Sequence, residues 1–169
     1  MSYVPDSGVN PRCHQRLSAS TDTLLAGVVG GCFLLLDQLL KFFIRLQPSH
    51  TWYLWRPWLG IEYFANRGVA FNIPIPNPIL LFLTPLILFG LTLSLVRWNK
   101  SPSTGTTWAI ALIISGAISN FLDRYLFGVT IDYIRIFTAV INLADILIVI
   151  GLLILLYQQK IKKTPSAIS

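Results

Sequence analysis

Asp132 and Asp145 are the side chains in this sequence best suited to carry out chemistry. Only seven acidic residues occur among 169, and these two, thirteen residues apart, lie beside or inside long apolar segments. A carboxylate is costly in such a segment and usually has a function there. The chain can turn back after Gly128, which allows the two acids to approach. Adjacent carboxylates can share a proton, activate water and protonate a carbonyl. The spacing predicts aspartic-protease chemistry, while polar residues that join helices or form an ion path remain open.

Two other acids in apolar segments are predicted to form structural ion pairs. Lys41 follows Asp37 by four residues, so that both share one helix face, and Arg124 directly follows Asp123. A neighbouring cation stabilises a charged carboxylate. Asp145 has no cation within one helical turn. It therefore remains the stronger candidate for catalysis.

These polar groups are expected to meet at one level of the molecule. With a rise of about 1.5 Å per helical residue, Asp145 lies roughly 9 Å inside the last apolar segment. The preceding segment brings Asn120 and Asp123 to its end on the same side. Asn142 shares a helix face with Asp145 and can supply a hydrogen-bond partner.

The elements that position these residues are predicted to be membrane-spanning helices. Hydrophobic residues make up 54% of the chain, charged residues make up 12%, and the mean hydropathy is +0.64. This composition indicates an integral membrane protein, and a helix needs about 20 apolar residues to cross a bilayer. We expect an all-α membrane protein with four transmembrane helices at about 24–46, 79–98, 107–127 and 139–157. The membrane domain (24–157) would follow a disordered N-terminal tail (1–23) and precede a basic tail (158–169).

The distribution of Lys and Arg predicts that both termini are cytoplasmic, because cytoplasmic flanks of membrane helices carry an excess of these residues. The basic residues that set this orientation are Arg12, Arg16, Arg97, Lys100, Lys160, Lys162 and Lys163. The connector 47–78 and the region of Asp132 and Asp145 then lie on the extracytoplasmic side. The site is therefore expected near that face of the membrane.

The connector 47–78 is predicted to form a small β-sheet at the lipid headgroups. Its segments 51–55 and 61–64 are rich in β-formers and in aromatic residues, and Pro57 and Gly60 separate them. Aromatic rings of this kind favour the membrane interface. A surface loop with interfacial anchors and a substrate-holding platform both remain open.

No metal, cofactor or nucleic acid is expected. His14 and His50 are predicted on opposite sides of the membrane, and no His or Cys cluster has the spacing of metal ligands. Cys13 and Cys32 lie at different depths and are not expected to pair. Basic and aromatic residues do not alternate as in nucleic-acid-binding proteins. Serine catalysis is disfavoured because no His lies near the membrane serines.

Five ordered motifs make the chain resemble the lipoprotein signal peptidases, also called signal peptidase II, which are membrane aspartic endopeptidases. The motifs are DQLLK (37–41), NRGVAF (66–71), GAISNFLDR (116–124), VTIDYI (129–134) and NLAD (142–145). The resemblance implies an extracytoplasmic β-sheet cradle and an interfacial helix between the first two transmembrane helices. One departure is Tyr133, which stands where Phe is common in the family.

The resemblance also implies the catalytic residues and the substrate. Asp132 and Asp145 would be the catalytic pair, and Asp37 with Lys41 would brace the first helix. The substrate would be a bacterial prolipoprotein with diacylglycerol on the Cys after the scissile bond. The enzyme would be a monomer among the lipids of the cytoplasmic (inner) membrane, and no cofactor is implied. The residues implied to bind substrate or shape the site are Asn66, Gly68, Ala70, Asn120, Asp123, Arg124, Asn142 and Ala144.

Two other classes remain open from the residues alone. A proton- or ion-coupled transporter could use Asp37, Lys41 and Asp145 as a relay, which predicts acids spread across the membrane depth. Asp123, Asp132 and Asp145 instead gather near one face. A scaffold with polar helix contacts predicts that replacing single acids harms folding.

Overall fold

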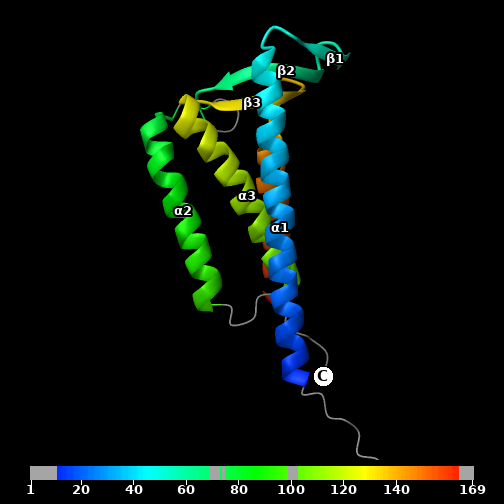
Figure 1. Cartoon of the computed structure of the whole chain (residues 1–169), viewed down its shortest axis with the longest axis vertical. Helices are drawn as coiled ribbons and strands as arrows, with labels where there is room; N and C mark the ends of the chain where they lie inside the picture. Colours follow the sequence, from blue (N-terminus) through cyan, green and yellow to red (C-terminus); the bar gives the residue numbers. More distant parts are fainter. Residues whose placement is uncertain (1–10, 69–72, 74, 99–102, 164–169) are drawn as a thin grey trace, which may run out of the picture.

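The computed structural model describes residues 11–68, 73, 75–98 and 103–163, and it shows long helices capped at one end by a small sheet (Figure 1). The helices are α1 (Pro11–Leu46), α2 (Asn77–Trp98), α3 (Thr104–Phe127) and α4 (Leu143–Lys163). The strands are β1 (Trp52–Trp55), β2 (Leu59–Asn66), β3 (Thr130–Ile136) and β4 (Ala139–Ile141). The fold is therefore mostly helical with a small antiparallel sheet, as predicted, and the sheet has four strands.

Three helices in the described part of the chain are long and apolar enough to cross a membrane. Their spanning segments are Ser20–Leu46, Thr104–Phe127 and Leu143–Lys160. The fourth helix, α2, has a shorter apolar segment, Asn77–Leu93. Large apolar side chains cover the outside of the bundle, as the lipid-facing surface of a membrane protein requires.

Helices α2 and α3 begin within three residues of the predicted positions, whereas α1 and α4 begin further from them. Helix α1 begins at Pro11, so residues 11–23 are helical where a disordered tail was predicted; residues 1–10 lie outside the described part. Helix α4 begins at Leu143 rather than at 139, because 139–141 form strand β4. A short buried strand and the start of an apolar helix have the same composition, so the apolar run did not separate them.

The sheet has the order β1-β2-β3-β4. A sheet in the connector was predicted, but strands β3 and β4, which follow α3, complete it. The predicted interfacial helix is not found among the described residues of the connector, where the two elements are β1 and β2. The β2–β3 register places Phe64 opposite Asp132 and Asn66 opposite Thr130. This pairing delivers Asn66 to the neighbourhood of Asp132.

An ion pair ties two strands of the sheet together away from Asp132. Glu62 accepts hydrogen bonds from the Tyr53 hydroxyl at 2.6 Å and from Nη2 of Arg135 at 2.5 Å. The Arg135 hydrogen bond lowers the pKa of Glu62 below its ordinary value. Arg135 is therefore the partner of Glu62, although it lies only three residues from Asp132 in the sequence.

Small residues allow α3 and α4 to pack closely. A Cβ atom on Gly116 would lie 2.5 Å from the carbonyl oxygen of Ala144, and one on Gly151 would lie 2.5 Å from that of Ala109. Helices in membranes commonly approach through such residues. The close contact fixes the first turn of α4, which carries Asp145, against α3.

Candidate active site

Asp132 and Asp145 come from different elements and line the same cavity. Asp132 lies on strand β3 and Asp145 lies in the first turn of helix α4. The chain reverses between them through the β3–β4 hairpin. The cavity has a volume of about 540 Å³. Its other lining residues include Asn66, Asn120, Arg124, Thr130, Val140, Ile141, Ile146 and Val149.

Asp132 is buried and each of its carboxylate oxygens accepts a hydrogen bond from an amide. Nδ2 of Asn66 donates to Oδ2 at 2.8 Å, and Nδ2 of Asn142 donates to Oδ1 at 2.6 Å. The side chain is 1% exposed. Burial, followed by the charge of Asp145, raises the pKa of Asp132 to about 7, although both hydrogen bonds oppose this shift. Asp132 can therefore hold a proton near neutral pH.

Asp145 is held by the residue that also holds Asp132. The backbone N–H of Asn142 donates to Oδ2 of Asp145 at 3.2 Å, and the backbone N–H of Asp145 donates to Oδ1 of Asn142 at 2.9 Å. Reciprocal bonds of this kind are characteristic of a helix N-terminus. Nδ2 of Asn120 donates to Oδ1 of Asp145 at 2.8 Å. Asn142 thus bridges the two carboxylates, because its Nδ2 donates to Asp132 and its backbone N–H donates to Asp145.

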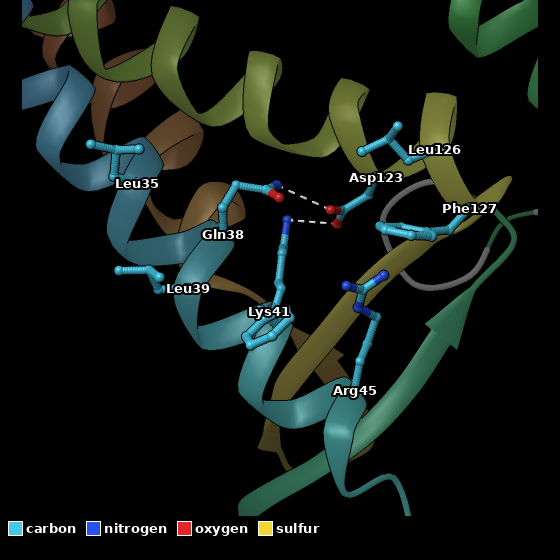
Figure 2. Close-up of a pocket in the computed structure, with 9 residues that line it drawn as sticks. Leu35, Gln38, Leu39, Lys41, Arg45, Asp123, Leu126 and Phe127 are labelled. Atoms are coloured by element: carbon cyan, nitrogen blue, oxygen red, sulfur yellow. Dashed lines mark hydrogen bonds and ion pairs between the residues drawn. The ribbon is translucent and has the colours of Figure 1, made fainter.

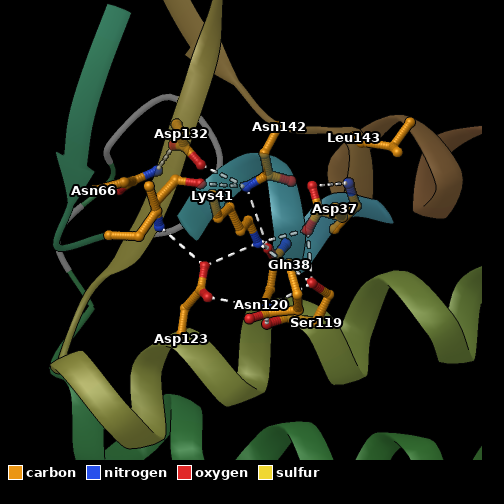
Figure 3. Close-up of polar contacts among 12 residues, drawn as sticks. Asp37, Gln38, Lys41, Asn66, Ser119, Asn120, Asp123, Asp132, Asn142 and Leu143 are labelled. Carbon is orange, nitrogen blue, oxygen red and sulfur yellow. Dashed lines mark hydrogen bonds and ion pairs between the residues drawn. The ribbon is translucent and has the colours of Figure 1, made fainter. Parts of the chain in front are cut away.

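A buried ion cluster contacts Asn120 on the side opposite to Asp145 (Figure 3). Nζ of Lys41 is 2.8 Å from Oδ2 of Asp37, 2.8 Å from Oδ2 of Asp123 and 2.9 Å from Oδ1 of Asn120. The predicted Asp37–Lys41 pair is confirmed. The predicted partner of Asp123 is wrong, because its ion pair is with Lys41 on α1 and not with the adjacent Arg124.

Two hydroxyl groups in this cluster shape the site although they were not predicted to do so. Oγ of Ser119 donates to Oδ2 of Asp37 at 2.6 Å, and the hydroxyl of Tyr133 donates to Oδ1 at 2.9 Å. The Tyr133 hydroxyl also accepts the backbone N–H of Leu143 at 3.2 Å. The spacing of Ser119, four residues before Asp123 on α3, was a usable signal, because both share a helix face.

Arg124 joins the end of α3 to the segment that follows β2. Its Nη2 donates to the carbonyl oxygen of Gly68 at 2.7 Å, while the Gly68 N–H donates to Oδ1 of Asn66 at 2.9 Å. Nη1 of Arg124 and Oγ1 of Thr130 are buried without a hydrogen-bond partner among the described residues. Both residues line the cavity. Ala70, also assigned to the site by the resemblance, lies outside the described part of the chain.

Ala144 is fully buried and serves the site through its backbone. Its N–H donates to Oδ1 of Asp37 at 3.4 Å, and its carbonyl oxygen faces Gly116. No group of three His, Cys, Asp or Glu side chains in the described ranges is arranged to hold a metal ion. The arrangement that remains is a carboxylate pair held by neutral amides, which can exchange protons with a substrate in the cavity.

The fold is one that bacterial membrane enzymes use. One solved structure, described as a bacterial membrane enzyme determined by the in meso method, matches with a TM-score of 0.72 and 23% identity. The match covers 87% of this chain and 94% of that chain. A second structure with the same description matches with a TM-score of 0.70 and 24% identity, over 84% and 94% of the two chains.

A family model described as signal peptidase (SPase) II matches residues 29–161. The lipoprotein signal peptidase of Caldanaerobacter subterraneus subsp. tengcongensis is 31% identical over 137 residues, which are 79% of this chain and 94% of the relative. That of Halothermothrix orenii is 34% identical, over 75% of this chain and 91% of the relative. The chain therefore belongs to the signal peptidase II family, whose members are proteases that remove lipoprotein signal peptides. The transporter alternative has no support from these matches.

Proposed function

We propose that this protein removes the signal peptide from diacylglyceryl-modified bacterial prolipoproteins by cutting before the lipidated Cys, with Asp132 and Asp145 as the catalytic pair. The single observation that carries the proposal is the bridge made by Asn142, which donates to Asp132 at 2.6 Å and to Asp145 at 3.2 Å beside one cavity. Membership of the signal peptidase II family supports the substrate class.

In the proposed mechanism the two acids hold one proton. Asp132 carries it up to a pH of about 7, because burial and the neighbouring charge raise the pKa of Asp132 to about 7. Asp145 takes a proton from a water molecule while the oxygen of that water attacks the scissile carbonyl carbon. At the same time Asp132 donates its proton to the carbonyl oxygen. When the C–N bond breaks, Asp145 gives its proton to the leaving amine. The hydroxyl group of the collapsing intermediate returns a proton to Asp132.

The cavity walls support binding of an extended peptide beside a lipid. Ile146 and Val149 on α4 and Val140 on β4 supply apolar surface. Nη1 of Arg124 and Oγ1 of Thr130, which have no partner among the described residues, are suited to bind backbone carbonyls of the substrate. Lipid chains in the bilayer would hold the modified Cys near the acids, so that positioning contributes to the rate.

We also propose that all four helices cross the cytoplasmic (inner) membrane, with both termini inside, the site near the outer face and the enzyme monomeric. Helices α1 and α3 end at the sheet and α2 and α4 begin there, which gives the alternating direction that four spans need (Figure 1). The segment Asn77–Leu93 is 17 residues, or about 26 Å, long. Local thinning of the bilayer can accommodate this length.

The test is cleavage of a diacylglyceryl-modified prolipoprotein and its unlipidated counterpart by the purified protein in detergent. Wild type should release the signal peptide from the lipidated form alone. Asp132→Asn and Asp145→Asn should each lower the rate by about 10²- to 10⁴-fold, the contribution typical of a general acid or base.

Asp22→Asn is the matched control, because Asp22 lies far along α1 from the site and contacts Thr104. This variant should retain the wild-type rate. Full cleavage by Asp132→Asn or Asp145→Asn would refute the assignment and direct attention to Asp123. Absence of cleavage by folded wild type would refute the function, and an ion-flux assay in vesicles would then test transport.

A further inference from the structure

A second hollow, which we call the α1–α3 groove, lies between helices α1 and α3 near the sheet (Figure 2). Its volume is about 320 Å³. The groove shares none of its lining residues with the active-site cavity. Lys41 and Asp123 form its inner end, and their ion pair separates it from Asn120 and the catalytic pair. The groove is therefore a distinct site on another face of the bundle.

The walls of the groove are apolar and open toward the lipid. Leu35 is 62% exposed and Leu126 is 60% exposed. From Leu35 to Arg45 the helix rises about 15 Å, which is half of the roughly 30 Å hydrocarbon core of a bilayer. Ser20–Leu46, 27 residues long, extends about 40 Å and so reaches the headgroup region. The groove thus extends along one leaflet, with Arg45 at headgroup level.

Arg45 closes the outer end of the groove and presents hydrogen-bond donors there. Its guanidinium carbon lies 3.8 Å from the centre of the Phe127 ring. No carboxylate within the described residues forms an ion pair with it. Stacking occupies the face of the guanidinium, whereas its N–H groups lie in the plane and can bind a phosphate in bidentate fashion.

The acid inside the groove does not compete for Arg45. Oδ2 of Asp123 is 2.8 Å from Nζ of Lys41, and Oδ1 accepts from Nε2 of Gln38 at 3.0 Å. Figure 2 shows both partners directed at the carboxylate. The positive charge of Arg45 is therefore available to an anion that enters from the lipid headgroups.

We propose that the α1–α3 groove binds an anionic glycerophospholipid of the surrounding leaflet, with its phosphate on Arg45 and one acyl chain along Leu35, Leu39 and Leu126. A zwitterionic phospholipid would bind more weakly, because its headgroup carries a cation toward the guanidinium. This binding site is independent of the substrate and of the catalytic pair, so it can be tested without turnover.

The experiment is native mass spectrometry of the full chain in detergent, titrated with dioleoylphosphatidylglycerol or dioleoylphosphatidylcholine. The acyl chains are identical, so the difference reports the headgroup. Wild type should bind the first phosphatidylglycerol about tenfold more tightly, which corresponds to about 1.4 kcal/mol. Arg45→Gln should reduce the affinity for phosphatidylglycerol to that for phosphatidylcholine.

Arg56→Gln is the matched control. Arg56 also lies over an aromatic ring, that of Tyr53 at 5.4 Å, but it does not line the groove. The Arg56→Gln variant should keep the tenfold preference. Leu39→Trp retains Arg45 and fills the apolar part of the α1–α3 groove, so it should lower the affinity for both lipids by a similar factor. It also tests the groove independently of how well Arg45→Gln folds.

Equal affinity of wild type for the two lipids would overturn the proposal. A preference that survives in Arg45→Gln, or that is lost equally in Arg56→Gln, would also overturn it, because the charge would then act elsewhere. Displacement of bound phosphatidylglycerol by a diacylglyceryl-modified peptide, and not by the unlipidated peptide, would identify the groove as a substrate-lipid site instead.

Discussion

Lys41 determines which way the side-chain amide of Asn120 faces. The ammonium group can only donate, and it lies 2.9 Å from Oδ1 of Asn120. Nδ2 of Asn120 therefore faces the opposite way and donates to Asp145 at 2.8 Å. A cation on α1 thus orients a donor on α3 toward a carboxylate on α4, without itself contacting that carboxylate.

Replacing Asn120 with Asp should impair catalysis, because the group that donates to Asp145 would be replaced by a hydrogen-bond acceptor. The new carboxylate would keep its bond to Lys41 but would present an oxygen to Asp145. Loss of one hydrogen bond to a charged group costs about 1.5–3 kcal/mol. We expect kcat/KM for prolipoprotein cleavage to fall by about 10- to 100-fold at pH 7, with partial recovery at lower pH, where the new acid is protonated and can donate again.

Asn120→Leu has a similar volume and cannot donate at any pH, so it serves as the control. Its activity should stay low across the pH range. Identical pH profiles for the Asp and Leu variants would show that Asn120 acts only through packing. Ser115→Ala, on the same helix, removes a hydroxyl that bonds to the carbonyl oxygen of Ala111 and should leave activity unchanged.

The activity should decline as the pH rises through about 7. Burial and the Asp145 charge raise the pKa of Asp132 to about 7, so the proton that Asp132 donates is lost above that value. The measurement is kcat/KM between pH 5 and pH 9 in one detergent. A rate that is flat up to pH 9 would contradict the assignment of Asp132 as the proton donor.

The raised pKa of Asp132 also predicts that the stability of the folded protein depends on pH. The folded protein keeps a proton on Asp132 in a range where the unfolded chain has released it, so this contribution to stability is complete below the ordinary pKa and disappears as pH rises through about 7. The melting temperature of wild type should fall between pH 5 and pH 8. Asp132→Asn should show a smaller decrease, and equal slopes would argue against the raised pKa.

Tyr133→Phe should weaken the fold more than the chemistry. Its hydroxyl joins Asp37 on α1 to the N–H of Leu143 at the start of α4. Without the hydroxyl these buried groups each lose a partner, at a cost of about 1–3 kcal/mol. We expect a lower melting temperature with kcat within about fivefold of wild type, because Asp132 and Asp145 keep their amide donors.

The comparison variant is Tyr157→Phe, which alters an exposed tyrosine on α4. Its melting temperature should equal that of wild type. A loss of activity in Tyr133→Phe at a temperature where the protein stays folded would instead assign the hydroxyl a part in positioning the first turn of α4.

Gly116→Ala should separate helices α3 and α4. The added carbon would lie 2.5 Å from the Ala144 carbonyl oxygen and 2.9 Å from Cγ1 of Ile148, distances at which backbone must move. Overpacking of this kind typically costs about 1–3 kcal/mol. Both the melting temperature and the cleavage rate should fall, because the displaced segment carries Asp145.

Gly90→Ala is the matched change on α2, where an added carbon meets no atom within 4 Å. It should be neutral or slightly stabilising, since Ala favours helix. Equal effects of the two substitutions would show that the α3–α4 contact is not tight.

Apolar run length located all four helices, because each of them coincides with a long apolar run in the sequence. It could not separate strand β4 from the start of α4, since both are apolar and they are adjacent in the sequence. The sheet was predicted only where aromatic residues and turn signals mark it, in β1 and β2. The pairing of β2 with β3 depends on the return of the chain after α3, and no local pattern in Thr130–Ile136 indicates it.

The sequence indicated which residues belong to the candidate site, but not all of the contacts that these residues make with one another. Asp37 and Lys41 share a helix face, so their ion pair followed from spacing. The partner of Asp123 did not, because Lys41 lies on another helix and Arg124 is the nearer cation in the sequence. Tyr133 was similarly hidden, since its hydroxyl function depends on the packing of α1 against the sheet.

The ion cluster has a consequence for how the protein enters the membrane. Helix α1 carries Asp37 with Lys41, and α3 carries Asp123 with Arg124, so each helix is electrically neutral at this depth before the two meet. Insertion into the bilayer can therefore proceed without an isolated charge on either helix. In the docked bundle Asp123 pairs with Lys41, while Arg124 donates to the carbonyl oxygen of Gly68. Assembly of the bundle and completion of the site are then the same event.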